Sequence, residues 1–278
     1  MNDLKLAQLQ SSWAKHLYAR LLHFGGHIRE TDVPPSPMEA RKADIALQCA
    51  LRPAVFGELG GFRPEETNRH TSWWGGCFLG APGESIPIGR SGKPMHPLLQ
   101  VRTDEIDILV PGIENYALLT LWIDLDGNLF EPVAGMDFSV FTHQTLEDLV
   151  PLGVGYRESE ILPTFPICWQ KAVDQQPSWQ DFAFKVPSRV AWSDTSEWFG
   201  NNPIVRRDYE LKSSCPVKLG GWPTWIQGSQ WETTEDDEDF VLQVDTTPKG
   251  RVGFGDSGSI YLFRQKRSGN WLLRCDFF

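Results

Sequence analysis

An internal repeat limits the fold of this chain more than any other feature. In the first copy the pair Gly75-Gly76 ends 24 residues before Gln100, and in the second the pair Gly220-Gly221 ends 22 residues before Gln243. Each glutamine is followed by an apolar run and then by a Gly-Asn turn, whose asparagine lies 28 and 27 residues further on. This agreement predicts two copies of a β unit of about 60 residues, related by a pseudo-two-fold axis.

The repeated residues have structural interpretations. A Gly-Gly pair suits a backbone with positive φ, or a place where two segments approach closely. A glutamine in an apolar strand needs partners for its amide. We interpret Gln100 and Gln243 as bonded to backbone across the two lobes; a role in ligand binding is the alternative.

The N-terminal section has the pattern of helices. Leu9, Trp13, Leu17 and Leu21 recur every four residues, which predicts a helix over 3–24. A second helix is expected over 38–51, closed by Arg52-Pro53. Further helical segments are expected at 143–150 and 194–200.

From about residue 57, short apolar runs between Gly and Pro predict strands. The expected class is α+β, a β-rich core of two pseudo-symmetric antiparallel repeats with an α-helical N-terminal section. The strands are expected at 98–102, 116–125, 181–186, 239–245 and 259–265. The expected organisation is one compact domain with a helical section 1–56, a first β lobe 57–150 and a second β lobe 151–278.

Composition narrows the class of protein. The chain carries 26 Lys and Arg against 36 Asp and Glu, a net charge of −10, which disfavours direct nucleic-acid binding. Its five cysteines are widely spaced without a CxxC pair, as in a cytosolic protein with reduced thiols. The N-terminus does not resemble a signal peptide, and no apolar run reaches the length of a membrane helix. We therefore expect a cytoplasmic protein.

The segment Gly255-Asp256-Ser257-Gly258 resembles a serine-protease motif only locally. A hydrolase would need Ser257 beside a base such as His70, His96 or His143, and no histidine stands in a protease-like context. The preferred interpretation is a tight turn before the strand 259–265. Motifs for a metal or a nucleotide cofactor are absent from the sequence, so no cofactor is expected.

An acidic run is the candidate partner-binding site. It comprises Glu235, Asp236, Asp237, Glu238 and Asp239 and follows Trp231. Such a run is usually a solvated loop, but it can also attract a basic partner. The 12 tryptophans gather near turns and serve either for packing or for stacking on a ligand such as a sugar.

The second repeat resembles the YwqG-like family, known by its domain of unknown function 1963. The resemblance lies in three motifs: Gly220-Gly221-Trp222-Pro223, Gln243-Val244-Asp245 and Gly255-Asp256-Ser257-Gly258. The first repeat departs from the family pattern because Cys77-Phe78 follows Gly76 without the proline, and Arg102 stands where an aspartate is typical. The resemblance implies a two-repeat, β-rich α+β fold without established catalytic residues. Some relatives occur beside toxins, where they look like antidotes.

Three functions follow as hypotheses. The first is a non-enzymatic immunity protein that occludes a cognate toxin; a nuclease toxin would offer the basic surface that an acidic protein fits. The second is a small-molecule or glycan binder that uses the Trp-rich turns. The third is a cryptic hydrolase built on Asp256 and Ser257. The oligomeric state is left open by the sequence.

Overall fold

The computed structural model describes residues 50–60, 70–152, 162–175, 177, 181, 215–227 and 237–278. The chain divides into two units, Met1–Arg52 with Gln175–Tyr209, and Pro53–Asp174 with Glu210–Phe278. Nearly all described residues belong to the second unit. The expected helix 3–24 lies outside the described residues, as does 38–51 except for Ala50 and Leu51, which are not helical.

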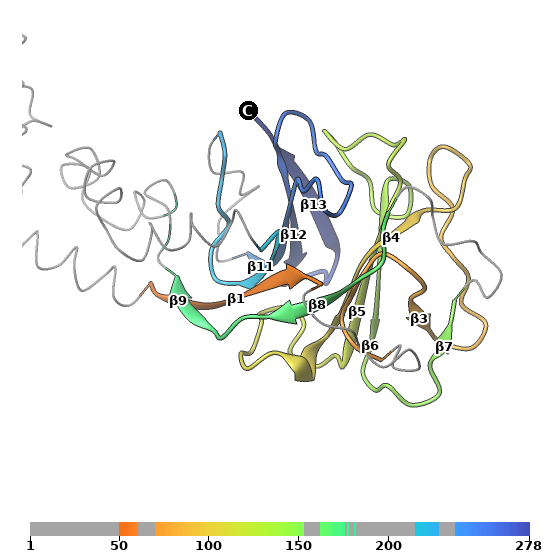
Figure 1. Ribbon diagram of the computed structural model, residues 1–278, viewed down its shortest axis with the longest axis horizontal. Coiled ribbons are helices and arrows are strands. Elements are labelled where there is room, and N and C mark those ends of the chain that lie inside the picture. Colours follow the sequence, from red (N-terminus) through yellow and green to blue (C-terminus); the bar gives the residue numbers. More distant parts are fainter. Residues whose placement is uncertain are drawn as a thin grey trace, which may run out of the picture. The chain divides into compact units, whose positions relative to one another are not determined.

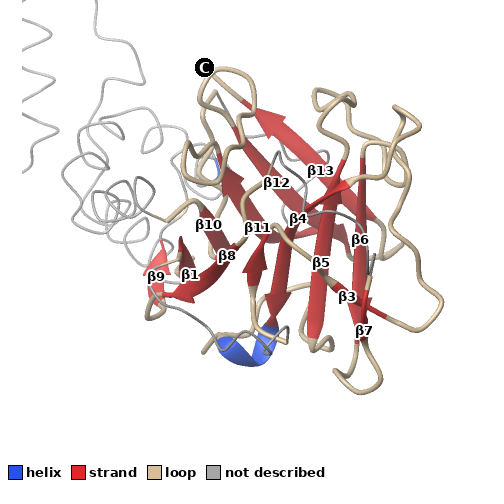
Figure 2. Cartoon of the chain, turned by 45° about the vertical axis from the view of Figure 1, so that its right-hand side comes forward, coloured by secondary structure: helices blue, strands red, loops and turns tan. Residues whose placement is uncertain are grey.

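The second unit is built from antiparallel strands, as Figure 2 shows. In spatial order the main sheet contains β13 (Trp271–Asp276), β12 (Ser259–Gln265), β11 (Glu238–Asp245), β10 (Val217–Gly220), β1 (Arg52–Leu59), β8 (Phe165–Trp169), β2 (Trp73–Trp74), β4 (His96–Arg102), β5 (Leu118–Ile123) and β6 (Phe138–His143). Beside this path β9 (Val173–Gln175) pairs with β1, while β3 (Leu79–Gly80) and β7 (Val150–Pro151) form a separate pair.

The prediction of an α+β class with an α-helical N-terminal section is wrong. Within the described ranges, strands dominate, and a short 3-10 turn, η2 (Thr103–Glu105), follows β4. Residues 52–56, assigned by sequence to the helical section, form the start of β1. The cause is tertiary, since these residues hydrogen-bond to β10, more than 150 positions further along the chain.

The prediction of a helix at 143–150 is also wrong. His143 ends β6, Asp148 has a positive φ of 61°, and Val150 opens β7 by pairing with Gly80. Pairing with a distant strand outweighs the weak helical periodicity of this segment. Of the strand expected at 181–186, only Asp181 is described, and its backbone is helical; the turn at 194–200 lies outside the described residues.

The strand order of the main sheet is symmetric about its centre. Outward from the pair β1 and β8, the strands β10, β11, β12 and β13 on one side correspond to β2, β4, β5 and β6 on the other. Gln100 and Gln243 hold matching places, opposite Trp73 in β2 and Lys218 in β10. At the centre, each half of the sheet contains a strand from the other half of the chain. β1, from the first half of the chain, pairs with β10 of the second, and β8, from the second half, pairs with β2 of the first. Figure 1 shows β1 and β8 side by side.

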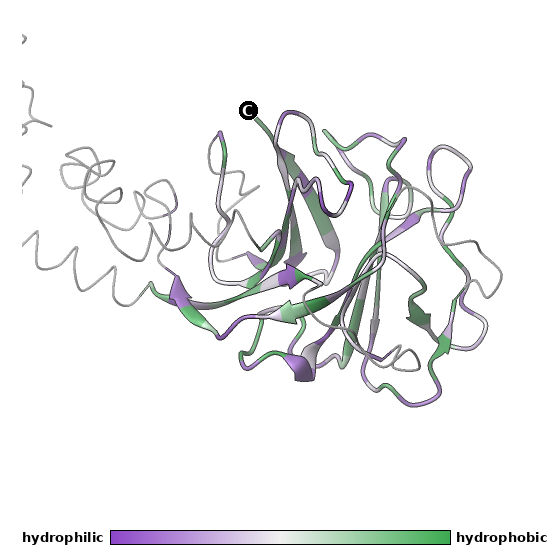
Figure 3. Ribbon diagram, in the orientation of Figure 1, coloured by the Kyte–Doolittle hydropathy of each residue, from purple (hydrophilic) through white to green (hydrophobic). Residues whose placement is uncertain are grey.

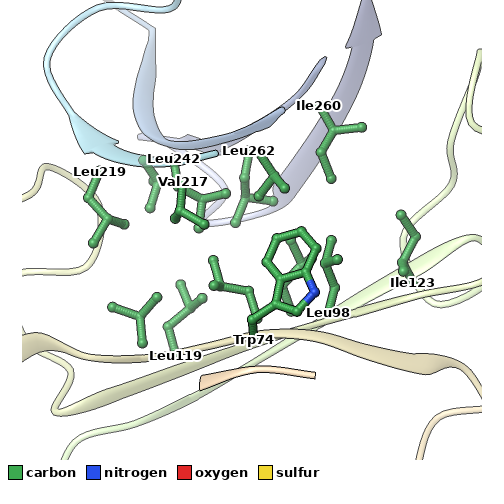
Figure 4. Packing of buried hydrophobic residues seen from close by; sticks show 14 of the residues in the cluster. Trp74, Leu98, Leu119, Ile123, Val217, Leu219, Leu242, Ile260 and Leu262 are labelled. Carbon is green, nitrogen blue, oxygen red and sulfur yellow. The ribbon is translucent and has the colours of Figure 1, made fainter. Parts of the chain in front are cut away.

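The core lies between the two halves of this sheet. Apolar residues concentrate in the strands, and hydrophilic residues concentrate in the loops (Figure 3). Figure 4 shows side chains of the two halves facing one another, Leu219, Leu242 and Ile260 on one side and Trp74 and Leu119 on the other. Burial of these apolar surfaces is the main favourable contribution to folding.

The Gly-Gly turns allow the central exchange. Gly75 has φ 62°, and a Cβ there would come within 2.5 Å of the carbonyl oxygen of Pro163, which precedes β8. Gly220 has φ 66°, and a Cβ there would come within 2.9 Å of the carbonyl oxygen of Pro53 at the start of β1. In both repeats, a glycine is needed for positive φ and for close backbone approach.

We expect Gly75→Ala to destabilise the fold by about 3 kcal/mol, because it adds a backbone clash to the cost of positive φ. Gly83→Ala is the matched control, since Gly83 has φ 92° but nothing within 4 Å of its added Cβ. It should cost about 1 kcal/mol. Urea unfolding followed by tryptophan fluorescence measures both. Equal losses in the two variants would show that the close approach has no energetic role.

Candidate functional site

The repeat glutamines bind loops within their own repeat. Gln100 accepts a hydrogen bond from the Leu79 amide at 2.8 Å and donates one to the Thr71 carbonyl at 2.8 Å. Gln243 accepts from the Thr224 amide at 2.9 Å. These partners lie in the segments beside the Gly-Gly turns, Leu79 at the start of β3, and not across the lobes as the sequence suggested. The glutamines therefore attach each loop to the outer face of its own half-sheet.

The second repeat adds a carboxylate to this arrangement. Gln243 donates to Asp245 at 2.8 Å, and the Ser259 hydroxyl also donates to Asp245. The first repeat has Arg102 at the matching position, and its side chain bonds Asp104 at the surface. The departure of the first repeat from the family pattern is thus accommodated by the Thr71 carbonyl, which takes the amide hydrogen of Gln100.

Lys218 is the buried cation of this region, with a residue exposure of 3%. Its Nζ donates to the Trp222 carbonyl and to the Thr224 hydroxyl, both at 2.6 Å. The Tyr261 hydroxyl donates to the Thr224 carbonyl at 2.8 Å, and burial raises the pKa of that phenol. This set of bonds holds the loop of Pro223 in place, so the geometry supports a structural role.

The segment Gly255-Asp256-Ser257-Gly258 forms a tight turn. Gly255 and Ser257 have positive φ values of 57° and 53°, and the Gly258 amide donates to the Phe254 carbonyl at 2.8 Å. The Ser257 hydroxyl lies 3.5 Å from Asp256. Phe277 packs against Gly255, which has no room for a Cβ. Here the structure agrees with the interpretation as a turn.

The histidines named for a hydrolase have other surroundings. His143 Nε2 lies 3.5 Å from Glu84 in the first repeat, while His96 opens β4 and pairs with Ile123. His70 is exposed. Within the described ranges, no hydrogen bond joins Ser257 to a histidine. The described groups therefore do not assemble the base and nucleophile that a serine hydrolase requires.

The acidic run divides into parts with different surroundings. Trp231, Glu235 and Asp236 lie outside the described residues. Glu238 is only 2% exposed and pairs with Arg274, with an N–O distance of 2.9 Å. Asp239 is half-buried and lies 3.5 Å from Lys266, whereas Asp237 lies at the start of the turn into β11. Glu238 is therefore committed to an internal ion pair and cannot contact a partner.

The chain matches the model of the domain of unknown function (DUF1963) over residues 72–270, more than two thirds of its length. This match includes both Gly-Gly turns, both glutamine strands and the Gly255–Gly258 turn. The chain belongs to the DUF1963 family. In a comparison with proteins of curated function, none matches it.

Most described tryptophans of the DUF1963 domain serve in packing. Trp74, Trp122 and Trp222 are at most 1% exposed, and Trp225 stacks on Phe263 with ring centroids 6.0 Å apart. Trp74 also donates to the Gly250 carbonyl at 3.2 Å. Trp192 and Trp198 lie outside the described residues. The buried rings cannot act as stacking platforms for a ligand without unfolding their surroundings.

Three further observations concern cysteines, metal ligands and membrane helices. Four of the five cysteines are described, and none of these four forms a disulfide. Burial raises the pKa of Cys275 to about 11. Among the described residues, there is no cluster of three or more His, Cys, Asp or Glu that could hold a metal ion. In the same part of the chain, no helix has the length and apolar character needed to cross a membrane.

A carboxylate that sequence analysis missed organises two surface loops of the domain. Asp137, which is fully buried, accepts two hydrogen bonds from Arg90, at 2.8 and 2.7 Å. It also accepts from the backbone amides of Asn128 and Val133, both at 2.9 Å. Asp137 thereby joins the loop containing Arg90 to the loop between β5 and β6. The sequence gives no periodic signal for this contact, because the two loops are more than 30 residues apart.

Nearby, Asp124 has a similar role. It is 4% exposed and accepts hydrogen bonds from the amides of Ser91 and Asp126. A Cβ at Gly89 would come within 2.3 Å of its carboxylate. Both loops are therefore held by buried carboxylates rather than by an apolar core of their own.

We expect Glu238→Gln to lower the free energy of unfolding by about 2 kcal/mol, because it leaves the charge of Arg274 without its buried anion. Asp237→Asn is the matched control, since it removes the neighbouring charge of a more exposed carboxylate, which lies 4.0 Å from the highly exposed Arg267. It should change stability by less than about 0.5 kcal/mol. Urea unfolding at neutral pH measures both. If Glu238→Gln is as stable as the wild type, this ion pair does not stabilise the fold.

The Arg90 guanidinium, with help from the Val133 and Asn128 amides, holds the pKa of Asp137 well below its usual range. The stability that Asp137 contributes is thus complete above the unfolded pKa of about 3.9 and is lost as the pH falls below it. We expect Asp137→Asn to remove part of the acid dependence of unfolding between about pH 4 and pH 2. Asp126→Asn, which removes an exposed carboxylate, should leave the acid dependence of unfolding nearly unchanged. Equal acid profiles for wild type and Asp137→Asn would contradict the assignment.

Proposed function

We propose that this protein is a non-enzymatic, cytosolic immunity protein that binds a cognate bacterial protein toxin and neutralises it by occlusion. A basic nuclease is the class of toxin that fits best. The observation that carries the proposal is the net charge of −10. An acidic protein is attracted to the cationic surface with which a nuclease binds its phosphate backbone. Such attraction accelerates association and favours a basic partner over others.

Two features of the site support binding rather than catalysis. Among the buried polar groups of the second repeat, Lys218 and Gln243 bond to the loop that contains Thr224, and Asp245 accepts from Gln243 and from Ser259 of β12. Their position between the half-sheet and its loop is that of structural groups. In addition, Ser257 lies in a turn whose described neighbours do not include a histidine base. Within the described part of the chain these groups have structural partners, which supports a function carried by the protein surface.

The test is co-expression of the protein with a toxin encoded beside its gene. We expect growth to be rescued, and we expect the purified pair to form a complex that inhibits the toxin's activity in proportion to occupancy. Raising the salt concentration should slow association more than it accelerates dissociation, since the attraction is electrostatic. If neither rescue nor a complex is seen, the proposed function is wrong.

A variant separates occlusion from catalysis. Ser257→Ala should rescue growth as well as the wild type does, because occlusion needs no nucleophile. Loss of rescue by Ser257→Ala, with folding and binding intact, would instead favour a hydrolase that inactivates the toxin chemically.

A further inference from the structure

We propose that the partner binds to an apolar surface with an acidic border, termed here the Phe130 face and composed of Ile88, Phe130, Val133, Met136 and Phe278. The occupant is a basic protein with an apolar centre to its contact surface. This inference rests on the proposed function and assigns its binding site. It moves that site away from the acidic run at 235–239.

The segments that carry the Phe130 face are linked by contacts in the structure. The ring of Phe130 meets that of Phe277 edge to face at a centroid distance of 5.2 Å, and the Phe278 amide donates to the Asp256 carbonyl at 3.1 Å. On the other side, the Arg90 amide donates to the Met136 carbonyl at 2.7 Å. The face thus joins the loop between β5 and β6 to the C-terminal residues. In Figure 1 this loop and the C-terminal end lie at the same end of the sheet.

The side chains of this face are unusually exposed for large apolar residues. Phe130 and Phe278 are 69% and 70% exposed, and Ile88, Val133 and Met136 are between 42% and 55% exposed. Clusters of exposed apolar side chains on a folded protein mark interaction sites more often than single ones do. Five of the seven exposed large apolar residues of the described chain belong to this one face.

The loops that carry these side chains are held in position from beneath. Asp137 bonds Asn128 and Val133, which flank the loop that presents Phe130, and it also bonds Arg90 beside Ile88. The exposure of Phe130 and Met136 is therefore built into the backbone rather than a result of a loose loop. A surface that is already ordered loses less entropy on binding, which favours affinity.

The charge around the face selects the partner. Three acidic residues are exposed on the loop 124–137 and the turn beside it, Asp126, Glu131 and Asp256, and the exposed basic residues of the loop 86–94 are Arg90 and Lys93. Arg90 is bound to Asp137, and Lys93 is bound to Asp126 at 2.9 Å. Glu131 and Asp256 remain exposed at the border. The border is therefore negative and complements a basic surface.

The same charge disfavours two other occupants. A second copy of this chain, related by a two-fold axis, would bring one acidic border against another, and like charges in an interface cost several kcal/mol. An anionic membrane would repel the border in the same way. A basic protein with apolar side chains at the centre satisfies both the charge and the apolar surface.

The experiment measures binding of the purified toxin domain, made inactive by mutation of its own catalytic residue, to the full-length protein. We expect Phe130→Asp and Met136→Asp each to weaken binding by about 30-fold or more, as for residues at the centre of an interface. The matched control is Leu109→Asp, because Leu109 is 78% exposed and lies on a different loop, between η2 and β5. Leu109→Asp should bind within about twofold of wild type.

A charge-reversal variant tests the border separately. Glu131→Lys with Asp256→Lys should slow association about tenfold at low salt and change dissociation little. Circular dichroism and thermal unfolding check that each variant folds, which is expected because every changed side chain is exposed. An unchanged association rate would overturn the selection of a basic partner by this border.

The outcomes separate the two proposals. If the wild type binds the toxin and Phe130→Asp binds equally well, the Phe130 face is wrong while the proposed function stands. If the wild type does not bind the toxin, the proposed function fails, and the assignment of this face to a toxin fails with it. If sedimentation shows a dimer that Phe130→Asp dissociates, the face holds a second copy, and the proposal is overturned.

Discussion

The close approach of two backbone segments at the centre of the sheet determines the rest of this structure. The carbonyl oxygens of Pro163 and Pro53 lie where a side chain on Gly75 or Gly220 would stand. Only glycine permits this approach at positive φ. Because the approach occurs twice, each central strand joins the other repeat's half-sheet, and neither half has a complete sheet without the other.

This exchange also explains how the chain uses its polar residues. Each half-sheet buries its inner face against the other half, so its outer face must be covered by its own loop. Gln100 and Gln243 provide that attachment, and their partners differ because Asp245 has no carboxylate counterpart in the first repeat. The DUF1963 pattern of glycine, glutamine and aspartate therefore describes how a loop is fastened to a sheet.

The candidate binding surfaces show why charge in a sequence is an incomplete guide. Glu238 and Asp239 are adjacent in the acidic run, yet alternation along β11 buries Glu238 against Arg274 and leaves Asp239 half-buried beside Lys266. Conversely, the loop that includes Phe130 has no strong charge run, but the tertiary structure brings Phe130 to Phe277, which itself packs against Gly255. A surface composed of three distant segments has no signature in any one of them.

The sequence by itself determined the local features of this protein: the Gly-Gly turns, the tight turn at 255–258, and the strands around Gln100, Gln243 and Tyr261. These depend on glycine stereochemistry and on short apolar runs, which act over a few residues. Only the tertiary structure decided that residues 52–56 form a strand rather than part of a helical section. It also decided that 143–150 is not helical and that Phe130 lies beside the C-terminal residues. Those outcomes depend on hydrogen bonds and packing between residues far apart in the chain, which local propensity does not encode.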